Sequence, residues 1–202
     1  MSSIRSGIRQ YGVAVRAMLV LTVVLGIAYP LAVTGIGQLA FSNQANGSPL
    51  IVGGESVGST LIGQSFTDAD GEPLPQWFQS RPSAAGDGYD AAASSGSNLG
   101  PENEDLVAAI DERRAAIAES DGVDPADVPA DALTASASGL DPQISPAYAR
   151  LQIARVAAAR GLSDDSVRAL VESFIQGRDL GYLGEETVNV LELNAALTEL
   201  KD

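Results

Sequence analysis

The chain has 202 residues, and its 26 acidic against 12 basic side chains give a net charge of −14. It contains no cysteine and no histidine, which excludes disulfides, zinc sites of the usual Cys/His type, and Ser–His–Asp or Cys–His catalysis. Lys201 is the only lysine and lies one residue from the C-terminus, which argues against a Ser–Lys dyad. The acidic balance argues against nucleic acid as a partner. Carboxylate-pair chemistry stays open because Asp and Glu are plentiful, but no pair stands out, and neither catalytic residues nor a metal site are predicted.

Residues 17–41 are predicted to form a transmembrane helix. The stretch from Ala17 to Phe41 holds no charged residue, and at about 1.5 Å per residue it is long enough to cross the roughly 30 Å core of a bilayer. Two alternatives are less favoured, because a cleaved signal peptide has a shorter apolar run and a buried core helix rarely runs so far without a charge. Pro30 lies in mid-span and is expected to kink the helix or to need support from neighbouring helices.

The charges beside this stretch predict its orientation. Arg5, Arg9 and Arg16 precede it with no acidic residue among them, whereas all 26 acidic residues lie from Glu55 onward. An excess of arginine marks the cytoplasmic side of a span. We therefore expect residues 1–16 to be a basic cytoplasmic tail and residues 42–202 to form a domain outside the cytoplasm. The protein would be a single-pass protein of the cell membrane, in contact with membrane lipid.

The residues after the span predict short strands and loops. The segment Gly53–Ser59 has the glycine spacing of a phosphate-binding loop but no lysine before its serine, so it is interpreted as a turn between short strands. Ser59–Phe66 is predicted to be a short strand or an extended piece, and Gln76–Gln79 a second short strand. From Ser83 to Gly100 the chain is rich in Gly, Ser, Ala and Asn. This segment is either a flexible linker or an ordered irregular surface, and its composition favours the linker.

Caps and apolar spacing in the second half of the chain predict helices. The first runs from about Pro101 to Ala118, and the second has Ser145 as its N-cap and ends before Gly161. The third has Ser163 as its N-cap and stops at Gly177. Residues 187–190 alternate as a strand does, and leucines then return at helical spacing up to Leu200. The predicted fold is α+β: one N-terminal transmembrane helix, then one small domain of short strands and three or four helices.

Segments along the whole chain carry a resemblance to a known family. No single segment is decisive, but all of the segments in one order behind one N-terminal anchor are highly specific for the family. The chain resembles the C subunits of the Kdp potassium-transporting P-type ATPase, although it is longer than that pattern at Asp68–Gln76. The matching segments are Tyr29-Pro30, Gln44–Ser48, Gly58–Phe66, Phe78, Arg81–Ala84, Ser95–Leu99, Leu133–Pro142, Ile144–Pro146, Arg155–Ala157 and Val188–Asn194.

The resemblance implies a role within a potassium uptake complex. The partners it implies are an ATP-hydrolysing subunit, a channel-like subunit that binds potassium, and a small accessory subunit. The chain itself would be a non-catalytic accessory and assembly subunit that stabilises the pump. It would need no cofactor of its own, because the complex handles ATP and potassium. The family is also proposed to act as a catalytic chaperone that raises the affinity of the ATP-hydrolysing subunit for ATP.

The resemblance also suggests a nucleotide site at Ser136, Ser138, Gly139 and Gln143, by a loose likeness to the signature sequence of ABC transporters. The residues themselves favour a different interpretation. The segment has no lysine and belongs to an acidic part of the chain. Ser138-Gly139 is typical of a turn, and Asp141-Pro142 leads into the helix cap at Ser145. A structural role therefore competes with nucleotide contact.

Five residues are candidates for contacts with partner subunits. Tyr29 and Pro30 lie in the span, and Arg81, Asn98 and Asp141 lie in segments predicted to be loops, which usually carry contacts on a rigid frame. An internal role is the alternative: Arg81 would pair with a carboxylate of the domain, and Asn98 would bond to loop backbone. The alternative for the whole chain is a membrane-anchored extracytoplasmic enzyme or binding protein that acts alone.

Overall fold

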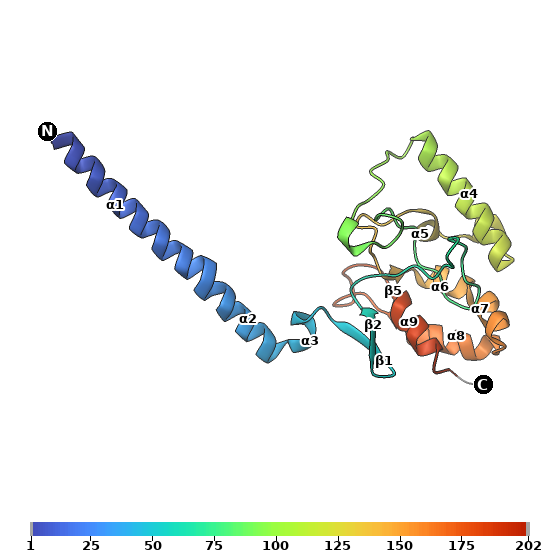
Figure 1. The fold of residues 1–202 in the computed structure, drawn as a ribbon. Coiled ribbons are helices and arrows are strands. Elements are labelled where there is room, and N and C mark those ends of the chain that lie inside the picture. The colour runs from blue at the N-terminus through green and yellow to red at the C-terminus, as the bar shows by residue number, and fades with distance from the viewer. Residues whose placement is uncertain (1, 201–202) are drawn as a thin grey trace. The chain divides into compact units, whose positions relative to one another are not determined.

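The computed structural model describes the backbone of residues 2–200 and the side chains from Arg9 to Leu200. The chain divides into two compact units, Met1–Pro49 and Leu50–Asp202. The first unit is helical and the second mixes short strands with helices (Figure 1). The predicted α+β class is confirmed.

The first unit is a long apolar helix followed by one short turn of helix. It consists of α1 (Ser2–Val23), a π-helical turn (Val24–Ala28), α2 (Tyr29–Ala40) and α3 (Ser42–Ala45). The part from Arg9 to Ala40 is long and apolar enough to cross a membrane. The helix begins well before Ala17, so the stretch that contains the flanking arginines is helical as well.

The π-helical turn lies directly before Pro30 and explains how the helix accommodates a proline. Pro30 has no N–H to donate, and its ring would crowd the carbonyl of the residue four positions earlier. The structure widens the helix just upstream, where the Tyr29 N–H donates to the Val24 carbonyl, five residues back. One wide turn absorbs the expected disturbance, and α2 continues to Ala40.

A β-hairpin connects to the second unit. Its strands are β1 (Pro49–Val52) and β2 (Glu55–Ser59), which are paired with each other. Gly53 and Gly54, at the turn, have φ values of 61° and 88°. Two successive positive φ angles are the geometry of a tight hairpin turn and favour glycine at both positions. The interpretation of Gly53–Ser59 as a turn between short strands is confirmed at Gly53-Gly54, whereas Glu55–Ser59 is itself the second strand.

The strand predicted at Gln76–Gln79 is wrong, and of the two alternatives for Ser59–Phe66 the strand is wrong beyond Ser59, where β2 ends. Residues 60–66 and 76–79 contain no strand. Their backbone groups bond to distant side chains and loops instead: the Gly63 N–H donates to the Leu140 carbonyl at 2.8 Å, and the Phe78 N–H donates to Asn194 Oδ1 at 2.9 Å. Apolar residues in these segments are buried by an irregular backbone rather than by a sheet.

The longest helix of the second unit is α4 (Glu104–Asp121). The Asn103 side chain accepts hydrogen bonds from the first helical turn, and Gly122 ends the helix in a left-handed conformation. The helix therefore starts after the predicted Pro101, because the cap residue is Asn103. Three one-turn helices lie around it in sequence: residues Ala91–Ala93, residues Pro125–Asp127, and α5 (Ala130–Leu133).

The predicted second helix is present as two helices, α6 (Pro146–Leu151) and α7 (Ile153–Arg160). Ser145 caps α6 as expected, since its hydroxyl accepts from the Tyr148 N–H at 3.1 Å. The break falls at Gln152, which is fully buried. Its Oε1 accepts from the Gln79 N–H at 2.6 Å, and its Nε2 donates to the Gln79 carbonyl at 3.2 Å.

The rest of the unit is α8 (Asp164–Ser173), β4 (Ile175–Gln176), β5 (Thr187–Asn189) and α9 (Val190–Leu197). Ser163 caps α8 as expected, but the helix ends at Ser173 rather than at Gly177, because the chain turns into β4. With β3 (Gln143–Ile144), these strands form an antiparallel sheet in the order β3-β5-β4.

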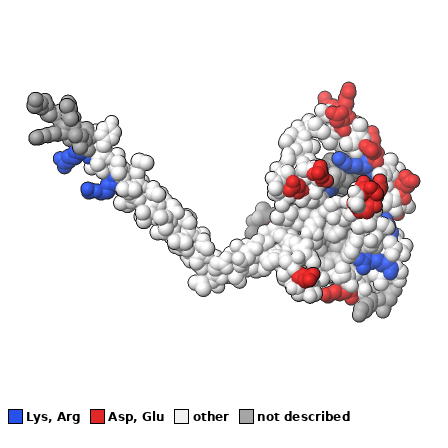
Figure 2. All heavy atoms as spheres, viewed as in Figure 1, with Lys and Arg blue, Asp and Glu red and all other residues white. Residues whose placement is uncertain are grey.

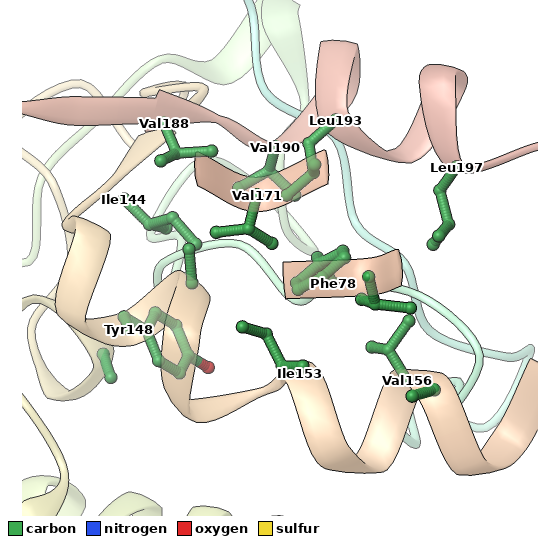
Figure 3. Close-up of a cluster of buried hydrophobic side chains, with 14 of the residues drawn as sticks. Phe78, Ile144, Tyr148, Ile153, Val156, Val171, Val188, Val190, Leu193 and Leu197 are labelled. Carbon is green, nitrogen blue, oxygen red and sulfur yellow. The ribbon is translucent and has the colours of Figure 1, made fainter. Parts of the chain in front are cut away.

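The hydrophobic core lies between this sheet and helices α6–α9 (Figure 3). Figure 3 shows Phe78 among the valines and leucines of α7, α8 and α9, although it comes from an irregular segment. Burial of such side chains is the main stabilising term of the unit. The large aliphatic members that are fully buried are Ile144, Ile153, Val156, Val167, Val171, Val188, Val190, Leu193 and Leu197.

Polar side chains hold the irregular segment onto this core. Asn194 on α9 bonds to both the N–H and the carbonyl of Phe78, each at 2.9 Å. Arg155 on α7 donates to the carbonyls of Pro75 and Trp77 and forms a buried ion pair with Asp121 at 2.8 Å. Side-chain groups thus take the place of a neighbouring strand for this backbone.

Candidate functional site

The predicted candidates Arg81 and Asp141 lie together. Arg81 Nη1 and Asp141 Oδ2 are 3.1 Å apart, and both side chains are partly buried. Arg81 Nη2 also donates to the Thr134 carbonyl at 3.4 Å, and the Tyr89 hydroxyl donates to the Arg81 carbonyl at 2.9 Å. The internal role that was the alternative for Arg81, pairing with a carboxylate of the domain, is therefore observed.

The segment suggested as a nucleotide site forms a turn that satisfies its own backbone. The Ser138 hydroxyl accepts from the Leu140 N–H at 3.1 Å, and the Gly139 N–H donates to the Ser136 carbonyl at 3.3 Å. Gly139 has a φ of 67°, and a Cβ there would lie 2.6 Å from the Ser95 carbonyl oxygen. A glycine is required at this position by both conformation and space.

Gln143 lies at the end of this turn, in β3. Its N–H donates to Asp141 Oδ1 at 3.0 Å, and it pairs in register with Asn189 of β5. Its position is therefore set by the sheet. Ser136, by contrast, is buried.

The segment 83–100 is an ordered irregular surface, and its interpretation as a flexible linker is wrong. The Ser83 hydroxyl donates to the Gly139 carbonyl at 2.6 Å. The Ser94 hydroxyl and the Ser95 N–H both donate to the Ser138 carbonyl at 2.9 Å. Serine hydroxyls, which suggest flexibility by composition, here fix one loop against another.

Asn98 lies further along this loop and bonds within it. Its Nδ2 donates to the Gly96 carbonyl at 3.1 Å, and its φ of 53° lies in the left-handed region that asparagine tolerates. The loop-backbone role considered for Asn98 is observed. Tyr29 and Pro30 begin α2 in the other unit, where both side chains are exposed.

An open pocket of about 550 Å³ lies at the Arg81–Asp141 pair, and Ser136 and Ser138 line it as well. Arg81 is the only basic residue among those that line it, and Asp141 already neutralises its charge. Acidic side chains lie across the face of the domain that Figure 2 shows. Recognition of phosphate groups relies on several cationic or backbone donors directed at the ligand. The chemistry of this pocket therefore fits a polyphosphate poorly.

A second pocket of about 370 Å³ lies on another side of Arg81 and was not foreseen from the sequence. Tyr89, Tyr148, Arg113 and Asp121 line it. Burial raises the pKa of Tyr89 to about 12 and raises that of Tyr148 further, so both phenols stay neutral at physiological pH. No pattern in the sequence brings these residues together, because they come from separate segments of the chain.

Asp121 lies against this second pocket. Burial raises the pKa of its carboxyl, and the neighbouring Arg155 guanidinium opposes that rise. Among residues 9–200, no group of His, Cys, Asp or Glu side chains is arranged to hold a metal ion.

Comparison with known proteins covers nearly the whole chain. A family model described as "KdpC: K+-transporting ATPase, c chain" matches residues 11–199. Three relatives named potassium-transporting ATPase KdpC subunit are similar to the chain. That of Kineococcus radiotolerans is 58% identical over 190 residues, 94% of this chain and 93% of the relative. That of Mycobacterium tuberculosis is 55% identical over 194 residues, 95% of this chain and 99% of the relative.

The third relative, from Caulobacter vibrioides, is 54% identical over 186 residues, 91% of this chain and 90% of the relative. The range matched by the family model includes the apolar helix, the irregular segments and the helical core. The chain therefore belongs to the KdpC family, the c chains of the potassium-transporting ATPase.

Proposed function

We propose that this protein is the membrane-anchored, non-catalytic accessory subunit of a potassium-transporting ATPase, and that it stabilises the assembled pump. The observation that carries the proposal is 58% identity with a KdpC subunit over 94% of the chain. Its partners would be the ATP-hydrolysing subunit, the channel-like potassium-binding subunit and the small accessory subunit.

Orientation is part of this proposal. Arg5, Arg9 and Arg16, which precede the uncharged stretch Ala17–Phe41, favour a cytoplasmic N-terminus. The domain that follows would then lie outside the cell membrane, where it meets little ATP. A rigid outer domain fits a mechanical role, in which it holds the complex together and caps the external mouth of the potassium pathway. The side-chain hydrogen bonds that fix its loops support that role.

A catalytic-chaperone role through direct ATP contact is the second candidate, and the structure gives it less support. The turn at Ser138-Gly139 uses its N–H groups internally, and the pocket beside it has a single, already paired arginine. Gln143→Ala tests direct ATP contact. Backbone bonds hold this residue in β3, so the change removes the side chain without removing those bonds. We expect the KM of the complex for ATP to be unchanged. A several-fold higher KM with unchanged assembly would favour nucleotide contact.

Assembly is the decisive test of the proposed function. The full chain, with an affinity tag after Asp202, would be purified in mild detergent from cells that express all the ATPase subunits. We expect the pump subunits to co-purify in constant proportion, and potassium-stimulated ATP hydrolysis to be lost when this chain is omitted. Isolation of the chain by itself, with full pump activity in its absence, would favour the alternative of a protein that acts alone.

Sidedness is tested by single cysteines in this cysteine-free chain. Ser97 is exposed and lies in the ordered loop, so Ser97→Cys introduces a reactive thiol without loss of a described side-chain bond. A membrane-impermeant maleimide should label it in intact cells, whereas Ser6→Cys, placed before the span, should be labelled only after lysis. The reverse pattern would overturn the orientation and restore direct ATP contact as the leading mechanism.

A further inference from the structure

The turn between β4 and β5 exposes a cluster of large apolar side chains. Leu180, Tyr182 and Leu183 are 81%, 69% and 49% exposed. Every residue from Gln176 to Glu186 is exposed, so no other part of the described domain covers this turn. Single exposed apolar residues are ordinary, but several together on one projection mark a contact surface. Arg178–Glu185 is called the 178–185 turn below.

The turn is held rigid by its own bonds. Asp179 and Leu183 exchange both backbone hydrogen bonds, each at 2.9 Å, and the Gly181 N–H donates to the Arg178 carbonyl at 3.0 Å. Arg178 Nη2 and Glu185 Oε2 close the base of the turn at 2.6 Å. The apolar side chains are therefore displayed by a fixed backbone, and little conformational entropy would be lost when they bind.

Leu180 occupies a backbone conformation that does not suit leucine. Its φ of 53° lies in the left-handed region, where glycine or asparagine would be accommodated with less strain. Its side chain gains no packing in return, because it is the most exposed large apolar residue of the domain. Neither the local backbone nor the core of the domain accounts for a leucine here.

We propose that the 178–185 turn is a docking tip, which inserts Leu180 and Tyr182 into an apolar pocket on the extracytoplasmic face of another subunit of the ATPase. The proposal rests on the proposed function, since it assumes that the chain assembles with that pump. The charge beside the tip is negative, because Asp179 and Glu186 remain once Glu185 is paired with Arg178. The complementary pocket would therefore carry basic side chains on its rim.

The same charges argue for a protein pocket rather than a bilayer surface. Segments that lie in a membrane surface flank their apolar side chains with basic residues, whereas the residues beside this tip are acidic. A tyrosine and a leucine on a rigid turn also match the aromatic and aliphatic anchors that fill pockets at the centres of protein interfaces.

Leu180→Asn separates docking from folding. Asparagine tolerates the left-handed conformation and removes the apolar side chain. We expect the full chain in detergent to unfold at the same or a higher temperature than wild type, while the assembled complex loses this subunit about tenfold faster. Val107→Asn, which changes an exposed apolar residue on α4, is the matched control and should leave dissociation unchanged. If the Leu180→Asn subunit dissociates from the complex at the wild-type rate, the proposal is overturned.

Photocrosslinking identifies what the tip contacts. Tyr182→Cys in the cysteine-free chain would be labelled with benzophenone maleimide before assembly. A covalent adduct with a pump subunit is expected. Adducts with lipid alone, or no adduct in an intact and active complex, would contradict the docking tip and leave the proposed function standing. Failure of the wild-type chain to assemble with any pump subunit would instead refute the proposed function, and the docking tip with it.

Discussion

The domain contains two regions that satisfy their backbone in different ways. Helices α6 to α9 bond internally and bury an apolar face, whereas residues 60–100 follow an irregular path with few backbone partners of their own. In the second region, side chains such as Asn194, Gln152 and Arg155 supply the missing hydrogen bonds. The difference shows that a loop can be as fixed as a helix when polar side chains from a rigid core hold it.

The largest loss of stability is expected from a change at Arg155, because its side chain joins both regions to α4. Replacement by Met would remove the ion pair with Asp121 and the bonds to the Pro75 and Trp77 carbonyls. Because Asp121 would stay buried without its partner, we expect a loss of about 3–5 kcal/mol in the free energy of unfolding. Denaturant unfolding of the full chain in detergent, followed by the fluorescence of the single tryptophan, Trp77, measures it.

The pH dependence of this variant supplies its control. Burial raises the pKa of the Asp121 carboxyl and Arg155 opposes that rise, so the Arg155→Met change would raise the pKa further. A carboxyl whose pKa is raised by folding favours the folded state when it is protonated. The penalty should therefore shrink as the pH falls from the raised pKa of the folded carboxyl toward its ordinary value. An Asp121→Asn, Arg155→Met double variant should lose this pH dependence, and a penalty that is constant with pH would contradict the explanation.

A second variant tests whether the irregular region depends on one side chain. Asn194→Ala would leave the N–H and the carbonyl of Phe78 buried without partners. We expect a loss of about 2–4 kcal/mol, because each unsatisfied buried group costs about 1–3 kcal/mol. Asn98→Gly is the matched control and should change stability by less than about 0.5 kcal/mol, since Asn98 is exposed and glycine suits its φ of 53°. Equal losses of stability from the two changes would contradict the claim that Asn194 has a special role in holding the irregular region.

Tyr89 tests how much one buried hydroxyl contributes to the stability of the irregular region. Its hydroxyl donates to the Arg81 carbonyl, and Tyr89→Phe should cost about 1 kcal/mol near neutral pH. Burial raises the pKa of Tyr89 from 10.0 to about 12, so its contribution holds at lower pH and is lost as the pH rises through this interval. Wild-type stability should fall more steeply there than that of Tyr89→Phe. Parallel alkaline unfolding curves for the two proteins would refute this origin of the pH dependence.

The smallest effect is expected at a surface ion pair of the helical region. Arg150 donates two hydrogen bonds to Glu172, at 2.6 and 2.8 Å, and thereby lowers the pKa of the Glu172 carboxyl. A carboxyl with a lowered pKa stabilises the folded state at neutral pH and loses that contribution in acid. Both side chains are exposed, so solvent screens the pair. Glu172→Gln should have the same free energy of unfolding as wild type in physiological salt. A clear destabilisation there would show that this exposed ion pair contributes to stability despite solvent screening.

The sequence predicts best the elements that depend on nearby residues. Ser145 and Ser163 cap helices as expected, the Gly53-Gly54 turn joins two strands, and the uncharged run forms a long helix. The errors occur where the deciding partner is distant. The N–H of Gln79 bonds to a side chain 73 residues away, which both removes the predicted strand and breaks the predicted helix at Gln152.

The candidate site shows the same limit. The sequence indicates Arg81 and Asp141 as separate candidates, and no local pattern shows that they pair across 60 residues of chain. The pocket lined by Tyr89, Tyr148 and Asp121 was missed for the same reason. Composition favours a linker for the serine- and glycine-rich segment, because nothing within the segment shows that its hydroxyls meet the carbonyls of Ser138 and Gly139.

The π-helical turn at Val24–Ala28 gives the membrane helix a change of angular phase. Each residue of an α-helix advances about 100° around the axis, so one additional residue in a turn rotates everything beyond it relative to everything before it. Side chains of α1 and α2 that a helical wheel places on one stripe therefore face different directions. A neighbouring helix that follows the stripe of α1 meets a different set of residues on α2. The span can thus present one face to one neighbour before Pro30 and another face to a second neighbour after it.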